Sequence, residues 1–519
     1  MAFVRTITTI GGYTMASRVL GFTRDILLAA IIGAGPVADA FFVAFKLPNL
    51  FRRLFAEGAF NAAFVPMFSG LLTTDGREAA RQFAAQALAV LVAALAVLLI
   101  VFELAMPWAM YGFAPGFAKD PDKFALAIEL TRITFPYLLF ISLVSLMGAV
   151  LNSLERFAAA AASPILLNVF LIGALIGAAP VMETPGHALA WGVATAGLAQ
   201  FLLLAYALRG AEMSLALSRP RLTPRVRRLL RLMGPGVVGA GVVQINLLVD
   251  VVIASLLPSG SISYLYFADR INQLPLGVVG IAVGTALLPM LSRQIKSGDD
   301  AGAQDSQNRA LEFALLLTVP ASLAMVVMAS PIILVLFGRG AFGAAEVTAT
   351  AWALAAYATG LPAYVLIKVL APGFFAHEDT VMPVKIACLC VVVNVVLNLA
   401  LMGPLAHAGI ALATALSAWL NAGLLAWGLR RRGWFALDAR LRRRLPRIAL
   451  SAAAMAAGLA AAAAALATPL GGGEAARIGA LAVLVAGGMV LYGAAAHLSG
   501  ATDLKELKGV FAKSAEGQS

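Results

Sequence analysis

The fold of this chain is decided by the stretch SRVLGFTRDILLAAIIGAGPVADAFFVAFKLPNLFRRLFAEGAFNAAFVP, which runs from Ser17 to Pro66. This stretch is apolar enough for the membrane, yet it carries eight charged side chains: Arg18, Arg24, Asp25, Asp39, Lys46, Arg52, Arg53 and Glu57. A charge near the centre of a bilayer costs about 2.5–3.5 kcal/mol. We therefore expect these side chains to face a water-filled cavity inside a helix bundle. Five of the eight are cations, so the cavity should attract an anion.

The composition of the whole chain indicates a polytopic membrane protein. Hydrophobic residues make up 61% of the 519 residues and charged residues 12%, and the mean hydropathy is +0.90. A soluble domain contains about 25% charged residues. Because a membrane span needs about 20 apolar residues, the chain has room for roughly a dozen or more helices and for no large soluble domain.

The net charge of +12 does not indicate a nucleic-acid partner, because the excess cations lie in short loops between apolar spans. Two clusters, Arg219–Arg231 and Arg430–Arg447, are typical of cytoplasmic loops under the positive-inside rule. This distribution predicts that both termini are cytoplasmic. Cys388 and Cys390 lie two residues apart in one apolar span, so they do not indicate a disulfide.

The hydropathy pattern predicts an all-α membrane protein with about fourteen spans. The expected spans are residues 6–33, 37–71, 79–110, 124–152, 158–180, 187–209, 228–257, 262–296, 306–337, 346–375, 380–402, 406–430, 446–468 and 475–499.

A weak internal repeat divides these spans into two lobes. FVPMFSG at Phe64–Gly70 is similar to LLPMLSR at Leu287–Arg293, and Glu155 and Glu378 fall at the same offset of 223 residues. The pattern predicts two six-helix lobes related by a pseudo-two-fold axis normal to the membrane, which is typical of rocking transporters. The N-terminal lobe is expected at 1–215 and the C-terminal lobe at 216–432. Residues 433–519 would add two apolar helices and a cytoplasmic tail.

Polar side chains recur every seven residues in the first two spans, which keeps each pair within about 20° of one helix face. The pairs are Ser17 with Arg24, Arg18 with Asp25, and Asp39 with Lys46. Pro48 is expected to break the second helix beside Arg52, and such irregular backbone is tolerated only at a cavity wall. The planar guanidinium of arginine suits a phosphate because it donates paired hydrogen bonds. Lys46 would add a point charge.

Internal ion pairs are the alternative explanation for these charges. Arg53 and Glu57 are four residues apart, so a local pair or a side chain that reaches the membrane edge fits them as well as a ligand does. For the three arginines that precede Arg53 in this stretch we favour a cavity role. The cations outnumber the carboxylates, so ion pairing alone would leave positive charge unneutralised. Asp25 and Asp39 are expected to orient those arginines rather than to touch an anionic ligand.

The second half of the chain contributes fewer charges to the expected cavity. Asp269 and Arg270 follow the segment SYLYFA, and Ser263 lies seven residues before Arg270. This spacing repeats that of Asp39 and Lys46. By its position in the repeat, Arg270 is expected to face the same cavity from the opposite lobe.

A carboxylate, two amides and a hydroxyl also lie in apolar spans of the second half: Asp250, Asn394, Asn398 and Thr414. Such a set could hold a sodium ion or a proton. A buried hydrogen-bond network between packed helices explains it equally well. No other cofactor and no enzyme activity are indicated, because the sequence has no Cys/His metal spacing and its four histidines are scattered near loops.

The segments SRVLGFTRDILLA and ADAFFVAFKLPNLFRRLFAEGAFNAAFVP, with the fourteen-span layout, resemble the MviN/MurJ family of lipid II flippases. That family belongs to the multidrug/oligosaccharidyl-lipid/polysaccharide exporter superfamily. The resemblance runs along essentially the whole chain and is most specific in the first two helices. It implies a protein of the bacterial cytoplasmic (inner) membrane that moves undecaprenyl-pyrophosphate-linked disaccharide-pentapeptide to the outer leaflet. Lipid II and membrane lipid would be its partners, and the sequence does not indicate an oligomeric state.

The resemblance also implies which side chains act. The functional positions of the family fall here on Arg18, Arg24, Asp39, Arg52, Glu57 and Arg270, with Ser17, Asp25 and Ser263 beside them. A sodium site of the family would map to Asp250, Asn394, Asn398 and Thr414. Asn398 stands where the family has a carboxylate, so any sodium affinity is expected to be weak.

The physical interpretation of the residues agrees with this resemblance. A pyrophosphate requires several cations, and a headgroup of sugar and peptide requires a large hydrated cavity. The prenyl tail is expected to stay in lipid or along an apolar groove built by the last two spans. A flippase for another undecaprenyl-linked glycan, such as O-antigen units, would share these features. A cation-coupled multidrug antiporter would need an acidic cavity, whereas this one is basic.

Overall fold

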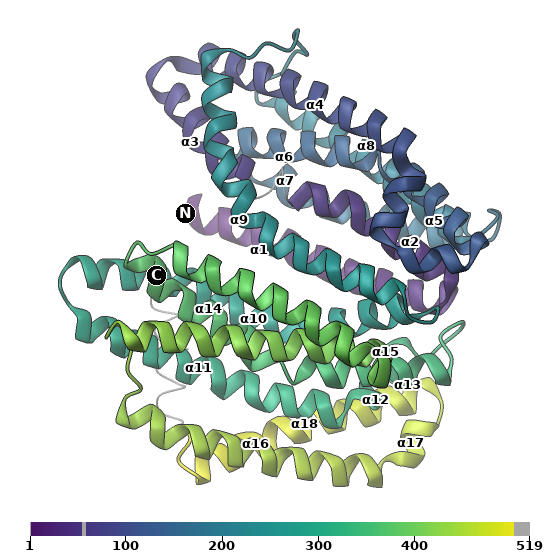
Figure 1. The fold of residues 1–519 in the computed structure, drawn as a ribbon, viewed down its shortest axis with the longest axis vertical. Coiled ribbons are helices and arrows are strands. Elements are labelled where there is room, and N and C mark those ends of the chain that lie inside the picture. Colours follow the sequence, from purple (N-terminus) through teal and green to yellow (C-terminus); the bar gives the residue numbers. More distant parts are fainter. Residues whose placement is uncertain (1, 54–58, 503–519) are drawn as a thin grey trace. The chain divides into compact units, whose positions relative to one another are not determined.

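The computed structural model describes residues 2–53 and 59–502, and the regular structure in those residues is helical throughout (Figure 1). The predicted all-α fold is therefore confirmed. The chain forms two compact units, Met1–Ser263 and Tyr264–Ser519.

The first unit is a bundle of long apolar helices. Its elements are α1 (Ala2–Ile32), α2 (Pro36–Phe51), α3 (Ala59–Thr74), α4 (Gly76–Phe113), the short η2 (Pro115–Lys119), α5 (Pro121–Thr134), α6 (Tyr137–Ser153), α7 (Ala158–Gly173), η3 (Ala174–Ala178), α8 (Pro185–Gly210) and α9 (Pro224–Ser255). Within this unit α1 packs on α7, α2 packs on α5, and α9 packs on α3 and α4.

Local sequence explains where α1 ends and α2 begins. Gly33 has a φ of 71°, a conformation that glycine adopts without a steric penalty. Pro36 then occupies the first turn of α2, where a missing N–H costs nothing. The break between the expected spans 6–33 and 37–71 is therefore found at these residues.

The prediction that Pro48 breaks the second helix was wrong, because α2 continues through Pro48 to Phe51. A proline leaves the carbonyl one turn earlier without its N–H partner. Here that carbonyl belongs to Ala44, and the hydroxyl of Thr134 on α5 donates to it over 2.9 Å. The side-chain amide of Asn49 donates to the next carbonyl, that of Phe45, over 2.8 Å. The Thr134 hydroxyl replaces the lost helical bond and Asn49 adds a further one, so the helix persists as far as a wider turn at residues 52–53.

The second unit contains α10 (Ser261–Lys296), whose first turn lies in the first unit, and the helices that follow it. These are α11 (Asp300–Val327), α12 (Ala329–Phe337), α13 (Ala344–Ala358), α14 (Leu361–Ala376), α15 (Val381–Arg431), α16 (Ala439–Ala465), the short α17 (Ala467–Gly471) and α18 (Glu474–Leu498). Element α15 joins two of the predicted spans across a kink at Ala406, which has a φ of 47° and a ψ of −130°.

Two loops that the sequence repeat matches to each other have the same backbone conformation. Glu155 after α6 has a φ of 60°, and Glu378 after α14 has a φ of 62°. In each loop the following amide bonds back to a carbonyl five residues earlier, from Arg156 to Leu151 and from Asp379 to Phe374. Left-handed residues of this kind close a helix in the same way at both positions. The local geometry thus agrees with the repeat found in the sequence.

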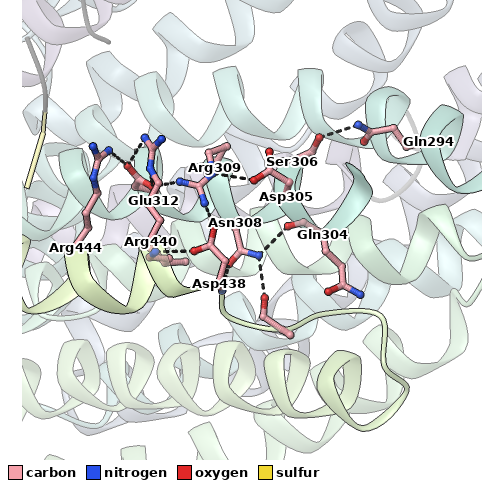
Figure 2. A network of polar contacts seen from close by, with 12 residues as sticks. Gln294, Gln304, Asp305, Ser306, Asn308, Arg309, Glu312, Asp438, Arg440 and Arg444 are labelled. Atoms are coloured by element: carbon pink, nitrogen blue, oxygen red, sulfur yellow. Dashed lines mark hydrogen bonds and ion pairs between the residues drawn. The ribbon is translucent and has the colours of Figure 1, made fainter. Parts of the chain in front are cut away.

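A charged network fastens α16 to α11 in the second unit (Figure 2). Glu312 is 7% exposed and accepts hydrogen bonds from Arg309 on its own helix and from Arg440 and Arg444 on α16. Both bonds from Arg440 are 3.1 Å long. Asp438 caps α16 at the amide of Leu441 and also pairs with Arg309. The basic cluster that the sequence assigned to a cytoplasmic loop is therefore partly neutralised inside the protein.

The helices coincide with the predicted spans, each span matching one helix, a pair of helices or one arm of α15. In the described residues nine helical segments are long and apolar enough to cross a membrane. The number of fourteen crossings stays a prediction, as do the lobe boundaries near residues 215 and 432. The expected second lobe includes α9, which packs on α3 and α4 of the first unit.

Candidate functional site

A buried charged cluster lies at the contact between α1 and α7 in the first unit. Arg24 and Asp25 are 4% and 2% exposed. The Arg24 guanidinium donates to Asp25 Oδ1 through Nε over 3.0 Å and through Nη2 over 2.7 Å. Its Nη1 donates to Asn168 Oδ1 over 2.9 Å. Charge-assisted bonds of this length are about twice as strong as neutral ones, so the guanidinium is held in one orientation.

Asn168 completes this cluster by linking it back to α1. Its side-chain amide donates to the carbonyl of Ser17 over 3.0 Å. Asp25 therefore orients an arginine, as expected from the sequence. Asn168 was not identified there, although a single asparagine in the apolar segment SPILLNVFLIG is the kind of polar residue that bonds across membrane helices.

The other predicted cations of the first two spans are more exposed. Arg18 is exposed and forms no ion pair with any side chain that the structure describes. Lys46 is exposed on α2 and lines a narrow apolar cavity with Leu248 and Val251 of α9. Arg52 is half-buried and Arg53 exposed, while Glu57 lies outside the described residues. The first unit thus presents both a neutralised arginine and solvent-accessible cations.

Asp39 is 1% exposed and bonds to the chain that leads into α10. Its Oδ1 accepts from the amide and the hydroxyl of Ser263, over 3.0 and 2.7 Å. Its Oδ2 accepts from the amide of Gly260 and from Lys123 Nζ, both over 2.7 Å. Asp39 therefore caps α10 and pairs with a lysine. The expectation that it orients an arginine was wrong, because a lysine from α5 reaches it instead.

Lys123, the partner of Asp39, is a buried cation that the sequence did not predict. It is 6% exposed, donates to Ser259 Oγ over 3.0 Å, and lies 4.1 Å from the ring centroid of Phe117. In the sequence it stands between loop residues and beside two aspartates, so it resembles a solvated charge. A cavity of about 290 Å³ adjoins it, lined in part by Lys119 and Ser255.

Gly116 brings η2 into direct contact with the end of α9 in the same region. Its amide donates to Ser255 Oγ over 3.2 Å. A Cβ at this position would stand 2.0 Å from the carbonyl oxygen of Ser255, so only glycine permits the approach. Asp39, Lys123 and Gly116 together bind the segment between α9 and α10 to α2, α5 and η2.

Arg270 belongs to the second unit, on α10. It is half-buried, and its guanidinium carbon lies 5.6 Å from the ring centroid of Tyr266, one turn earlier. Its neighbour Asp269 accepts a hydrogen bond from Gln273. A guanidinium stacked on an aromatic ring keeps donors at its edge, which suits it to an anionic ligand.

The four residues of the predicted cation site are divided between the two units. Asp250 is half-buried on α9 of the first unit, and the other three lie on α15 of the second. Asn394 and Asn398 are fully buried, and Asn398 Nδ2 donates to Asn394 Oδ1 over 2.9 Å. Thr414 donates to the carbonyl of Ile410 over 3.0 Å and keeps lone pairs for another partner. The amide and hydroxyl oxygens suit a hard cation, and a sodium or proton role stays a prediction.

Comparison with known proteins identifies relatives along the whole chain. A family model described as "Lipid II flippase MurJ" matches residues 28–478. A probable lipid II flippase MurJ of Rhizobium meliloti (strain 1021) is 46% identical over 514 residues, which cover 98% of this chain and 96% of that protein. Lipid II flippase MurJ of Burkholderia cenocepacia is 40% identical over 437 residues, which cover 83% of this chain and 85% of that protein.

Solved structures share the fold. A lipid II flippase MurJ in an inward closed conformation has a TM-score of 0.78 at 24% identity, covering 94% of this chain and 98% of that one. An inward-facing multidrug resistance MATE transporter of the MOP superfamily has a TM-score of 0.68 at 13% identity, covering 82% of this chain and 98% of that one. Because the family model spans most of the sequence and its curated members are similar along their length, this chain belongs to the lipid II flippase MurJ family.

Proposed function

We propose that this protein moves lipid II from the inner to the outer leaflet of the bacterial cytoplasmic membrane. The main support for the proposal is that the first unit combines one oriented, buried arginine with exposed cations. Asp25 and Asn168 fix the orientation of the Arg24 guanidinium, while Arg18 and Lys46 are exposed. Family membership supplies the substrate, since the curated relatives are named for lipid II. A pyrophosphate is the part of that substrate which cations recognise.

The transport step is proposed to be alternating access. The headgroup would be loaded from the cytoplasm and released outside while the prenyl tail stays in lipid or along an apolar face of α16 and α18. Both helices carry large exposed apolar side chains, among them Leu450, Val483 and Met489. Both termini are proposed to be cytoplasmic, because the basic clusters lie in loops on the same side under the positive-inside rule. A sodium ion or a proton at Asp250 is proposed to reset the protein after release.

Depletion in the host organism tests the substrate. If lipid II is moved, cells that lose this protein lyse and accumulate lipid-linked peptidoglycan precursor, and a curated relative restores growth. If the substrate is another undecaprenyl-linked glycan, such as O-antigen units, cells grow and lose that surface glycan instead. Efflux of cationic drugs without either phenotype would indicate an antiporter.

A further inference from the structure

Lys368 on α14 is a charged residue to which no role has been assigned. It lies halfway along α14, within the apolar segment Ala344–Ala376, which is long enough to cross a membrane. Its side chain is exposed, whereas the residues that follow it, Val369 and Leu370, are buried. An ammonium at this depth in contact with lipid would be costly. Water or a polar ligand is therefore expected at its tip.

Among the described residues, none neutralises this lysine. Lys368 forms no hydrogen bond or ion pair with any residue that the structure describes. Helix α14 packs on α11 and α15, whose charged side chains are paired with other residues or lie near the ends of those helices. Glu312 of α11 accepts from three arginines, and Lys385 is exposed near the start of α15. A cation in an apolar segment, with no counter-charge among the residues that the structure describes, is suited to an anion supplied from outside.

Gly280 on α10 makes room for this side chain. A Cβ on Gly280 would stand 2.9 Å from Lys368 Cδ and 3.1 Å from Lys368 Nζ. The lysine stem therefore crosses the face of α10 beside Gly280, where a larger residue would have to push the lysine tip aside. On a regular helix Gly280 lies within about 80° of Arg270 and about 15 Å further along the axis. Lys368 thus places a second cation beside α10, about three turns beyond Arg270.

We propose that Lys368 binds an anionic group of the lipid II headgroup, a phosphate or a peptide carboxylate, at a second position along α10. This inference rests on the proposed function and specifies how that substrate is held. Arg270 and Lys368 belong to one unit and are separated by a length that a disaccharide-pentapeptide spans but a pyrophosphate alone does not. The second position would therefore contact a part of the headgroup that Arg270 does not reach at the same time.

Binding to the purified full-length protein in detergent tests this proposal. The probes are lipid II, lipid II with its peptide carboxylates amidated, and undecaprenyl pyrophosphate. Lys368→Met is expected to weaken lipid II binding about tenfold or more, the loss typical of one hydrogen bond to a charged group. Lys368→Arg should recover part of it. Lys385→Met is the matched control, because it removes one exposed lysine of the same unit, and it should bind as the wild type does.

The three probes identify the anion. If Lys368→Met weakens lipid II but not its amidated form, the partner is a carboxylate. If it weakens undecaprenyl pyrophosphate as well, the partner is a phosphate. Unchanged affinity for all probes, or an equal loss in Lys385→Met, would overturn the proposal while leaving the lipid II function intact. A wild type that binds none of the probes would overturn the proposed function and this inference together.

A double-mutant cycle tests the geometry independently of folding. Gly280→Ala is expected to displace the lysine tip and to weaken lipid II binding in the wild-type background. In a Lys368→Ala background the same change should have no further effect, because the side chain that approaches Gly280 is gone. Additive losses would show that Gly280 and Lys368 act separately, and the shared position would then be rejected.

Discussion

At the scale of single residues, the arginines of the first unit are in different states. Arg24 is neutralised by Asp25 and steadied by Asn168, whereas Arg18 is exposed. A phosphate that reaches Arg24 would compete with Asp25 for the N–H donors of the guanidinium. Asp25 holds the Arg24 guanidinium in one orientation, as expected for an arginine that is to bind a phosphate.

Each of the four arginines that are predicted to bind the pyrophosphate should be needed for growth. Arg18, Arg24, Arg52 and Arg270 changed singly to Ala are expected to fail in complementing a flippase-depleted strain, although the protein still inserts. Lysine at the same positions should restore growth only in part, because the paired donors of the guanidinium are lost. Arg228→Ala, in an exposed basic cluster, is the control and should complement. Normal growth of all four alanine variants would refute the pyrophosphate-binding role.

Asp250 should link transport to an ion gradient. A carboxylate in an apolar span must be protonated, ion-bound or paired. We expect flipping in proteoliposomes to respond to an imposed sodium or proton gradient in the wild type and to lose that response in Asp250→Asn. If neither the gradient nor the substitution alters the rate, Asp250 has a packing role only.

The sequence predicted contacts between residues that are close in the chain and missed contacts between residues that are far apart in it. The pairing of Arg24 with Asp25 follows from adjacency. Asn168 reaches Arg24 across 144 residues, and Lys123 reaches Asp39 across 84. Nothing in the local pattern around Lys123 distinguishes it from a solvated loop lysine, because its burial is produced by Phe117 and the chain before α10.

At the scale of the elements, hydropathy predicted nearly every helix, because a long apolar run has few alternatives to a helix in a bilayer. The course of α2 was mispredicted for a specific reason. A proline breaks a helix when its freed carbonyl finds no donor, and the hydroxyl of Thr134 supplies that donor from another helix. Such compensation is tertiary and leaves no trace in the sequence near Pro48.

The docking of α16 should depend on Glu312. Removing one partner of a buried charged network costs about 3–5 kcal/mol, so Glu312→Gln is expected to lower the thermal unfolding temperature of the purified protein clearly. Asp305→Asn is the matched control, since Asp305 meets Arg309 at 3.3 Å with its side chain 67% exposed. Such surface pairs contribute about 0–1 kcal/mol. Equal unfolding temperatures for the two variants would contradict the network's role.

At the scale of the whole molecule, alternating access requires contacts that hold one side shut and then separate. The bonds from Asp39 to Gly260 and Ser263 are suited to this role, because they join α2 to the start of α10. Cysteines at 39 and 263, in a background without Cys388 and Cys390, should crosslink and block flipping. Reduction should restore the rate of the uncrosslinked double variant.

The single cysteine variants give the baseline for this experiment, since the change at Asp39 also removes the partner of Lys123. Oxidation should leave their activity unaltered. Full flipping by the crosslinked double variant would refute a mechanism in which α2 and the start of α10 must part.

The network around Glu312 can be completed only after α16 has been synthesised, well after α11. Arg440 follows Glu312 by 128 residues and Arg444 by 132. At about 5–20 residues per second the ribosome needs roughly 6–26 s to cover that distance. Throughout this interval Glu312 has Arg309 as its nearest basic neighbour in the chain. A chain that stops before α16 leaves this carboxylate without two of its three arginines, so we expect truncated copies to be the first that membrane proteases remove.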